Sequence, residues 1–69
     1  PKEFILIFDI PRAMNTLKVQ VWRELRRANC KMVQFSIWKS DDLKRLMEIA
    51  LWIKKSGGRA SILEEKFIF

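Results

Sequence analysis

Carboxylates are the side chains of this sequence best suited to catalysis, because it contains no histidine and only one cysteine. The lack of histidine excludes His-based acid–base chemistry and the usual zinc ligand sets. Asp9 stands apart from the other acidic residues because it closes the apolar run Phe4–Phe8. A carboxylate in that position either caps the helix or loop that follows or binds a divalent cation such as Mg²⁺, which prefers oxygen ligands. Asp9 is therefore the candidate catalytic and metal-binding residue.

One Asp per chain is too few for a dedicated Mg²⁺ site, but a two-fold axis that brings two copies of Asp9 together would double the ligand set. Ser36 has no His or evident basic partner, so we do not expect it to act as a nucleophile. Asp41 and Asp42 are better explained as the start of a helix. The lone Cys30 cannot form an internal disulfide, which favours a reducing, cytoplasmic location.

The run Phe4–Asp9 predicts a strand that is buried on both faces. Alternate residues of a strand point to opposite faces, and no polar residue interrupts this run before Asp9. The 69 residues make one domain (1–69), whose own helices can cover only one face of a sheet. A core of this size rarely supplies more than about 3–5 kcal/mol of stability without further support. We therefore expect a second copy of the chain to cover the other face.

The segment from Arg12 to Asn29 has the periodicity of an amphipathic helix. Its apolar stripe consists of Met14, Leu17, Val21, Leu25 and Ala28, with Trp22 on the flank. The net charge of +6 favours a polyanion partner, nucleic acid before membrane, because no stretch resembles a lipid-inserting or membrane-spanning helix. The basic residues of this segment are therefore either phosphate-binding groups or a solvated helix face. They are Arg12, Arg23, Arg26 and Arg27.

The second half of the chain begins with Met32–Lys39, whose alternation predicts either one strand or two very short strands with a tight turn near residues 34–36. Ser40–Asp42 starts a second helix, and Gly57 or Gly58 ends it. Arg59–Phe69 predicts one long strand or two joined by a bend, ending in an apolar segment that should add to a sheet edge. The buried stripe of the second helix is predicted to be Leu43, Leu46, Met47, Ala50 and Ile53.

Trp52 lies outside that stripe. It either packs against a C-terminal segment or a neighbouring chain, or offers a stacking face to a nucleic-acid base.

Two short segments, Leu6–Pro11 and Val33–Trp38, carry a resemblance to known families. The residues Leu-Ile-Phe-Asp-Ile-Pro, followed by Val-Gln-Phe-Ser-Ile-Trp and a capped helix, resemble the small CRISPR-associated adaptation proteins often described as endoribonucleases, the smaller partner of the adaptation integrase. The same combination resembles the C-terminal domain of phenylacetate-catabolism repressors, although Phe8 stands where the CRISPR family often has Tyr. The resemblance covers nearly the whole chain.

The resemblance implies an α+β, ferredoxin-like βαββαβ sandwich with two helices on one face of an antiparallel sheet, dimerising through the sheet. It implies a turn near Gln34–Ser36, a Mg²⁺ bound between Asp9 of two protomers, and positioning roles for Ser36 and Trp38. The C-terminal segment would extend the sheet of the partner. The residues expected at the dimer interface are Phe4, Phe8, Phe67 and Phe69.

Two functions follow as expectations. The first is a homodimeric nucleic-acid-binding protein of the CRISPR adaptation type, with a larger integrase subunit as a further partner and magnesium-dependent phosphodiester cleavage at Asp9. The second is a non-catalytic dimerisation or regulatory module. A weaker third interpretation is a toxin-like or antitoxin-like small RNase on the same fold.

Overall fold

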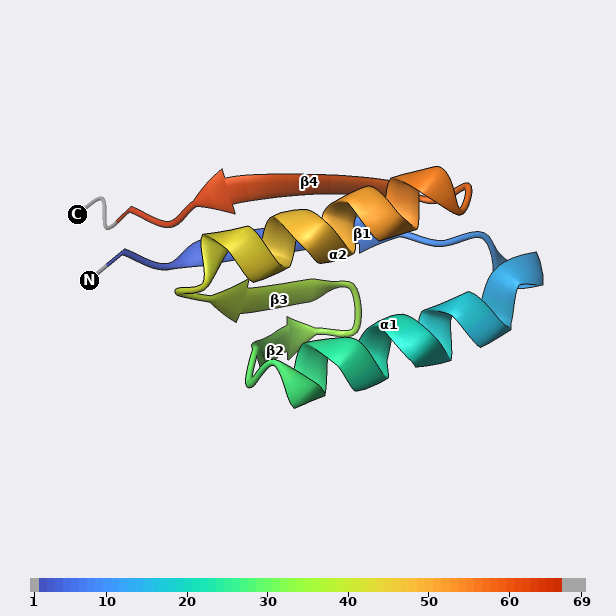
Figure 1. Ribbon diagram of the computed structural model, residues 1–69, viewed down its shortest axis with the longest axis horizontal. Coiled ribbons are helices and arrows are strands. Elements are labelled where there is room, and N and C mark those ends of the chain that lie inside the picture. Colours follow the sequence, from blue (N-terminus) through green and yellow to red (C-terminus); the bar gives the residue numbers. More distant parts are fainter. Residues whose placement is uncertain (1, 67–69) are drawn as a thin grey trace.

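The computed structural model describes residues 2–66, which form one sheet and two main helices (Figure 1). Their order is β1 (Phe4–Asp9), a 3₁₀ turn η1 (Arg12–Met14), α1 (Asn15–Arg27), β2 (Lys31–Gln34), β3 (Ile37–Ser40), α2 (Leu43–Lys55) and β4 (Arg59–Glu64).

The strands form a four-stranded sheet in the order β2-β3-β1-β4, with every neighbouring pair antiparallel. Each strand–helix–strand unit is therefore split, since a strand of the other unit lies between its two parallel strands. Both helices contribute to a single hydrophobic core on one face of the sheet. This is the α+β, ferredoxin-like βαββαβ sandwich expected from the sequence.

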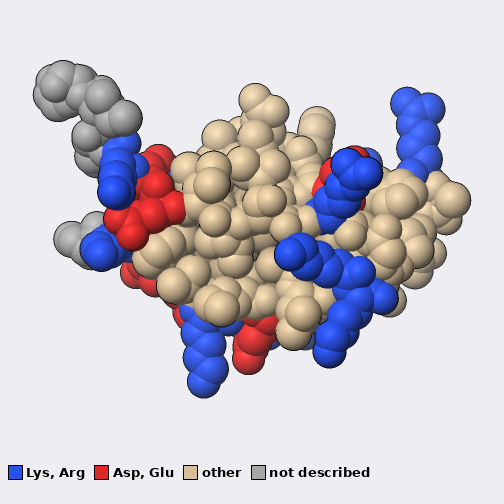
Figure 2. All heavy atoms as spheres, turned by 90° about the horizontal axis from the view of Figure 1, so that it is seen from above, with Lys and Arg blue, Asp and Glu red and all other residues tan. Residues whose placement is uncertain are grey.

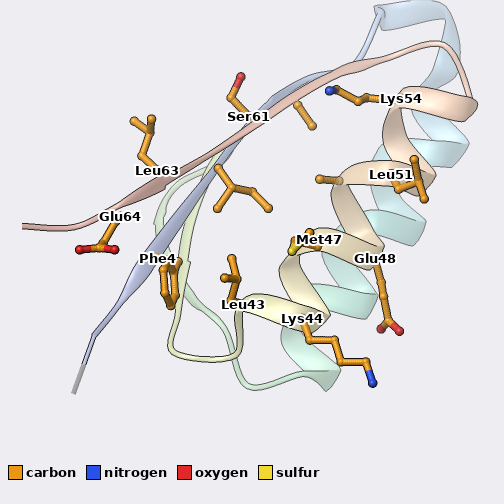
Figure 3. A pocket seen from close by; sticks show the side chains of 13 residues that line it. Phe4, Leu43, Lys44, Met47, Glu48, Leu51, Lys54, Ser61, Leu63 and Glu64 are labelled. Carbon is orange, nitrogen blue, oxygen red and sulfur yellow. The ribbon is translucent and has the colours of Figure 1, made fainter.

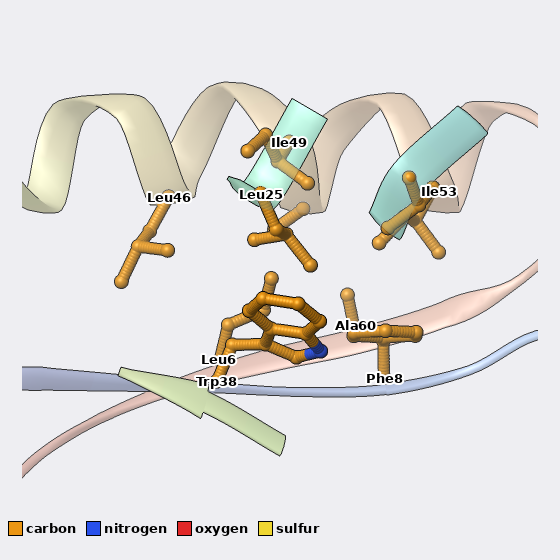
Figure 4. Close-up of a cluster of buried hydrophobic side chains, with 10 residues drawn as sticks. Leu6, Phe8, Leu25, Trp38, Leu46, Ile49, Ile53 and Ala60 are labelled. Carbon is orange, nitrogen blue, oxygen red and sulfur yellow. The ribbon is translucent and has the colours of Figure 1, made fainter. Parts of the chain in front are cut away.

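The core lies between the helices and the inner face of the sheet, and Figure 4 shows the two helices above the strands. Leu6 and Phe8 of β1 point into it, as the alternation of the strand requires. Trp38 of β3 is the largest side chain in the core and is only 2% exposed. The helices contribute Val21, Leu25, Leu46, Ile49, Ala50 and Ile53.

The segment between the helices is a hairpin of two short strands, which decides the alternative that periodicity leaves open. Phe35 and Ser36 form the turn. The Phe35 carbonyl accepts a hydrogen bond from the indole Nε1–H of Trp22 and another from that of Trp38, each at 3.0 Å. The turn therefore satisfies the polar atom of the buried Trp38 and is tied to α1 at the same time.

Capping residues define both ends of α2 and the C-terminal end of α1. Asp42 is the N-cap of α2, and its Oδ1 accepts a hydrogen bond from the Arg45 N–H at 3.0 Å. Gly57 ends α2 with φ +107°, a conformation that favours glycine. Asn29 has φ +61° after α1, and the Cys30 N–H donates to the Leu25 carbonyl at 3.0 Å.

Two details of the helices differ from the prediction. The first helix begins as a 3₁₀ turn after Pro11, so α1 proper starts at Asn15. On α2, Ile49 is buried although it is not part of the predicted stripe, whereas Leu43 and Met47, which are part of it, are exposed, Met47 by 56%. Apolar residues occur on several sides of α2, so their spacing alone does not select the stripe that meets the sheet.

Candidate functional site

Asp9 is exposed at the last residue of β1, where the strand leaves the sheet. The loop that follows α2 packs directly against this strand end. A Cβ at Gly58 would lie 3.0 Å from the Asp9 carbonyl and 2.7 Å from Cγ2 of Ile53, so only a glycine fits there without displacing backbone. A Cβ at Gly57 would lie 3.1 Å from Cε of Met14, which places η1 beside the same loop.

Three strands meet at this end of the sheet. Asp9 is the register partner of Arg59 in β4. On the other side of β1, the Phe8 N–H donates to the Ser36 carbonyl at 3.0 Å, so the hairpin turn lies beside the strand end. The structure therefore brings Asp9 and Ser36 to the same end of the sheet, although 27 positions separate them in the sequence.

The segments that meet at the Asp9 end of β1 carry basic residues. Arg12 follows it in η1, Arg59 lies opposite it in the sheet, and Lys54 and Lys55 end α2 just before the loop that packs on β1. All four are exposed, and none forms an ion pair with another residue of the described range 2–66. We call this group the basic end: Arg12, Lys54, Lys55 and Arg59.

Acidic side chains gather at the opposite end of the molecule. Figure 2 shows them towards the side that carries the chain termini, with Lys and Arg predominating on the other side. Glu64 ends β4 there and Glu65 follows it, and each pairs with a lysine, Glu64 with Lys2 and Glu65 with Lys39. The net charge of +6 is thus unevenly distributed, with the acidic side chains concentrated at the end that carries the termini.

The arginines of α1 are separate from the basic end. Arg23 and Arg26 are exposed and unpaired within the described residues, as the periodicity predicts for the outer face of this helix. Arg27 instead binds Glu24, Nη1 to Oε1, at 2.9 Å. Glu24 also accepts from Arg45 at 2.6 Å, and this ion pair joins α1 to α2.

The metal ligands that one chain offers are few. No group of three or more Cys, Asp or Glu side chains that could hold a metal ion occurs within residues 2–66. Asp9 is the carboxylate at the basic end, and it has cations as neighbours. Proteins bind Mg²⁺ through one or two carboxylates together with water and substrate phosphates, and one chain offers Asp9 alone at this end, so a second carboxylate would have to come from a second copy.

The uncovered face of the sheet is apolar at its centre. Strand alternation puts Ile5, Ile7 and Asp9 on this face. The register partners of the two isoleucines are Ile37 and Lys39 of β3 and Ser61 and Leu63 of β4, so apolar residues are flanked there by one lysine and one serine. Ile7 remains 36% exposed and Leu63 52% exposed. An antiparallel sheet that meets water on one face normally carries polar residues there.

The predicted interface residues Phe4 and Phe8 are wrong for a dimer through that face. Phe8 is only 5% exposed and belongs to the core, and Phe4 packs against the core, because both point to the helix-covered side of β1. Ile5 and Ile7 occupy the uncovered face instead, on the same side as Asp9. The remaining two expected interface residues, Phe67 and Phe69, lie outside the described residues.

A second apolar surface runs along the edge strand β4. A groove of about 870 Å³ lies between β4 and α2. Figure 3 shows Leu43 and Met47 of α2 along it with Phe4 of β1 opposite Leu43, while the side chains of Ser61 and Leu63 project to the other side of β4. Lys44 and Glu48 of α2 and Glu64 of β4 are among its lining residues, so its charges have both signs.

The other residues singled out in the sequence have structural roles. Trp38 lies in the core, and Trp52 of α2 is half-buried, packs against the core and lies beside Glu24 of α1. Burial raises the pKa of the Cys30 thiol, although a hydrogen bond with Ser40 opposes the shift. Cys30 therefore stays protonated near neutral pH and is a poor nucleophile.

The geometry defines a class, a small basic α+β domain of the ferredoxin-like type with one carboxylate at its positive end. No protein-family model matches the sequence, and a search of curated proteins finds no similar one. Neither α1 nor α2 has the length and apolar character that a helix needs to cross a membrane.

Three features of the site escape sequence reasoning. Lys54 and Lys55 have an ordinary explanation as charges that favour a helix C-terminus. Arg59 joins Asp9 only through the pairing of β1 with β4. The third feature is which residues occupy the uncovered face. The sequence predicts such a face, and the alternation of residues 4–9 groups Ile5, Ile7 and Asp9, but Phe4 and Phe8 were expected there instead.

Proposed function

We propose that this protein is a homodimeric nucleic-acid-binding protein of the CRISPR adaptation type, acting in the cytoplasm beside a larger integrase subunit. The observation that carries the nucleic-acid part is the basic end, whose four exposed cations form no ion pair within residues 2–66 and belong to segments that meet at the end of β1. Arg and Lys side chains bind phosphate oxygens through charge and hydrogen bonds. The resemblance of residues 6–11 and 33–38 supports the choice of family.

Two copies of the chain, packed through the uncovered sheet faces, would bring two Asp9 residues close to the symmetry axis. Asp9 lies on the same face as Ile5 and Ile7, so the contact that buries the isoleucines also brings the carboxylates closer. A bound Mg²⁺ would activate water and neutralise charge on a phosphate. The arginines of the basic end would hold the phosphodiester backbone.

Binding is tested by removing two cations of the basic end. We expect Arg12→Gln/Arg59→Gln to weaken binding of an RNA or DNA oligonucleotide about 10-fold at 100 mM salt, because two phosphate contacts are lost. Each lost contact should also lower the magnitude of the slope of log K against log[salt] by about 0.7–0.9. Fluorescence anisotropy titrations between 50 and 300 mM salt measure both quantities.

Lys31→Gln/Lys44→Gln is the matched control. It lowers the net charge from +6 to +4, as the first variant does, but removes exposed cations outside the basic end. Equal losses in the two variants would mean that only overall charge matters. Binding that does not respond to salt in the wild type would contradict the proposal.

Cleavage is tested by Asp9→Asn, which removes the carboxylate charge and keeps the shape of the side chain. We expect magnesium-dependent cleavage of RNA or duplex DNA to fall at least about 100-fold, while binding becomes about two-fold tighter because a negative charge leaves the basic end. Gel assays with Mg²⁺ and with EDTA measure cleavage, and fluorescence anisotropy measures binding. Equal cleavage by both proteins would remove Asp9 from the mechanism.

A non-catalytic dimerisation or regulatory module, related to the C-terminal domain of the repressors, is the second candidate. The apolar uncovered face favours it, because that surface needs a protein partner whether or not nucleic acid is bound. This candidate predicts a stable dimer whose contacts with RNA and DNA are weak and insensitive to Arg12→Gln/Arg59→Gln.

A further inference from the structure

The most exposed aromatic ring of the described residues is also held on a fixed backbone. Phe35 is 69% exposed at the turn between β2 and β3. Its carbonyl accepts the two indole N–H groups of Trp22 and Trp38, each at 3.0 Å. One of these donors belongs to α1 and the other to the buried core. The turn is therefore braced from two directions while the phenyl ring stays in solvent.

Trp22 extends this aromatic surface onto α1. The centroids of the Trp22 and Phe35 rings are 5.8 Å apart with an interplanar angle of 33°, a contact that leaves the outer side of Phe35 open. Nζ of Lys18 lies 5.5 Å from the centroid of the Trp22 ring. Lys18, Trp22 and Arg26 follow one another at intervals of four residues, so they form a line along one side of the helix.

The charges along this line are positive. Neither Lys18 nor Arg26 forms an ion pair with another residue between positions 2 and 66. The acidic residue of α1, Glu24, projects towards α2, where it binds Arg45. The surface thus combines aromatic rings with unpaired cations, whereas the apolar groove beside β4 is lined by charges of both signs.

The turn also lies next to the basic end. Ser36, which follows Phe35, accepts a hydrogen bond from the Phe8 N–H one residue before Asp9. The turn that carries Phe35 is thus hydrogen-bonded to β1 next to Asp9, whose register partner in β4 is Arg59.

We propose that Phe35 and Trp22, with Lys18 and Arg26 beside them, form a stacking platform for an unpaired nucleobase, so that the ligand of this chain is single-stranded nucleic acid. This inference rests on the proposed nucleic-acid binding and names the substrate class for it. Every base has a flat π face, so such a platform accepts any base, and the cations take the phosphates on either side. In a duplex both faces of each base are already stacked, and only the phosphates remain available.

The test compares wild type, Phe35→Ala and Phe35→Tyr on three labelled ligands. They are a 20-nucleotide single strand, the duplex of the same sequence, and a single strand with abasic sites. We expect Phe35→Ala to weaken single-strand binding about 5- to 50-fold, as the loss of one stacked base does elsewhere. The salt slope should stay unchanged because stacking releases no counterions. Phe35→Tyr keeps a ring and should bind like wild type.

Wild type and Phe35→Ala should have the same affinity for the abasic strand, and the same affinity for the duplex. Leu51→Ala is the control for loss of an exposed apolar side chain far from the turn. Thermal melting of each variant by circular dichroism checks the fold, which the exposed position of Phe35 should preserve.

The outcomes separate the two proposals. Salt-dependent binding of all ligands with no effect of Phe35→Ala would overturn the platform and leave the proposed binding function intact. No binding of any ligand by wild type would overturn both. A shift in self-association of Phe35→Ala on sedimentation, with unchanged single-strand binding, would assign the surface to a protein partner and overturn the platform.

Discussion

Trp38→Ala should leave little folded protein at 25 °C. Trp38 is 2% exposed and lies in the middle of the core, between β1 and both helices (Figure 4). Truncating a buried Trp to Ala costs about 3–5 kcal/mol of unfolding free energy. A domain of this size rarely has more than about 3–5 kcal/mol in total. Far-UV circular dichroism during thermal unfolding measures the loss, at one fixed protein concentration because self-association shifts stability.

Two further variants show which part of Trp38 matters. Trp38→Phe keeps most of the buried ring but removes the Nε1–H donor to the Phe35 carbonyl, so we expect a loss of about 1–2 kcal/mol. Met47→Ala, on an exposed position of α2, should change the unfolding free energy by less than about 0.5 kcal/mol. A melting temperature of Trp38→Ala within a few degrees of wild type would show that the core does not depend on this residue.

The fold could be predicted from the sequence because the local signals agree with one another. The run 4–9, the stripe of residue 21 and its neighbours, and the caps around Asp42 and Gly57 each specify one element. Short segments contain too few residues to specify their secondary structure. Residues 31–40 are compatible with one strand or two, since both choices preserve the alternation, and the two indole contacts at Phe35 hold the turn in place.

The candidate site was predictable only in part, because it is assembled across the sheet. Asp9 is visible as a lone carboxylate after an apolar run. Its neighbours Ser36 and Arg59 join it through hydrogen bonding and register between strands far apart in the chain. The residue pattern within one segment cannot predict such a contact between distant strands. The same holds for which face of β1 the helices cover. Alternation places Phe8 and Ile7 on opposite faces but does not determine which of the two faces is buried under the helices.

Ile7→Asp should convert the protein from dimer to monomer at micromolar concentration. Ile7 lies at the centre of the uncovered sheet face, with Ile37 and Ser61 as its register partners. In a two-fold dimer through this face the new carboxylate occurs twice, and each copy loses its hydration inside an apolar contact. We expect the dissociation constant to rise at least about 100-fold, equal to about 2.7 kcal/mol. Sedimentation equilibrium over a range of concentrations measures it.

Met47→Asp is the matched control, because it places the same charge on the exposed apolar row of α2 beside the β4 groove. Ile7 is already 36% exposed, so the Ile7→Asp monomer should still fold, with a cost near the roughly 1 kcal/mol span of strand propensities. Dissociation by Met47→Asp and not by Ile7→Asp would move the dimer contact to the groove and separate the two Asp9 carboxylates. A wild type that sediments as a single chain at these concentrations would remove the shared metal site, because Asp9 alone offers one carboxylate among cations.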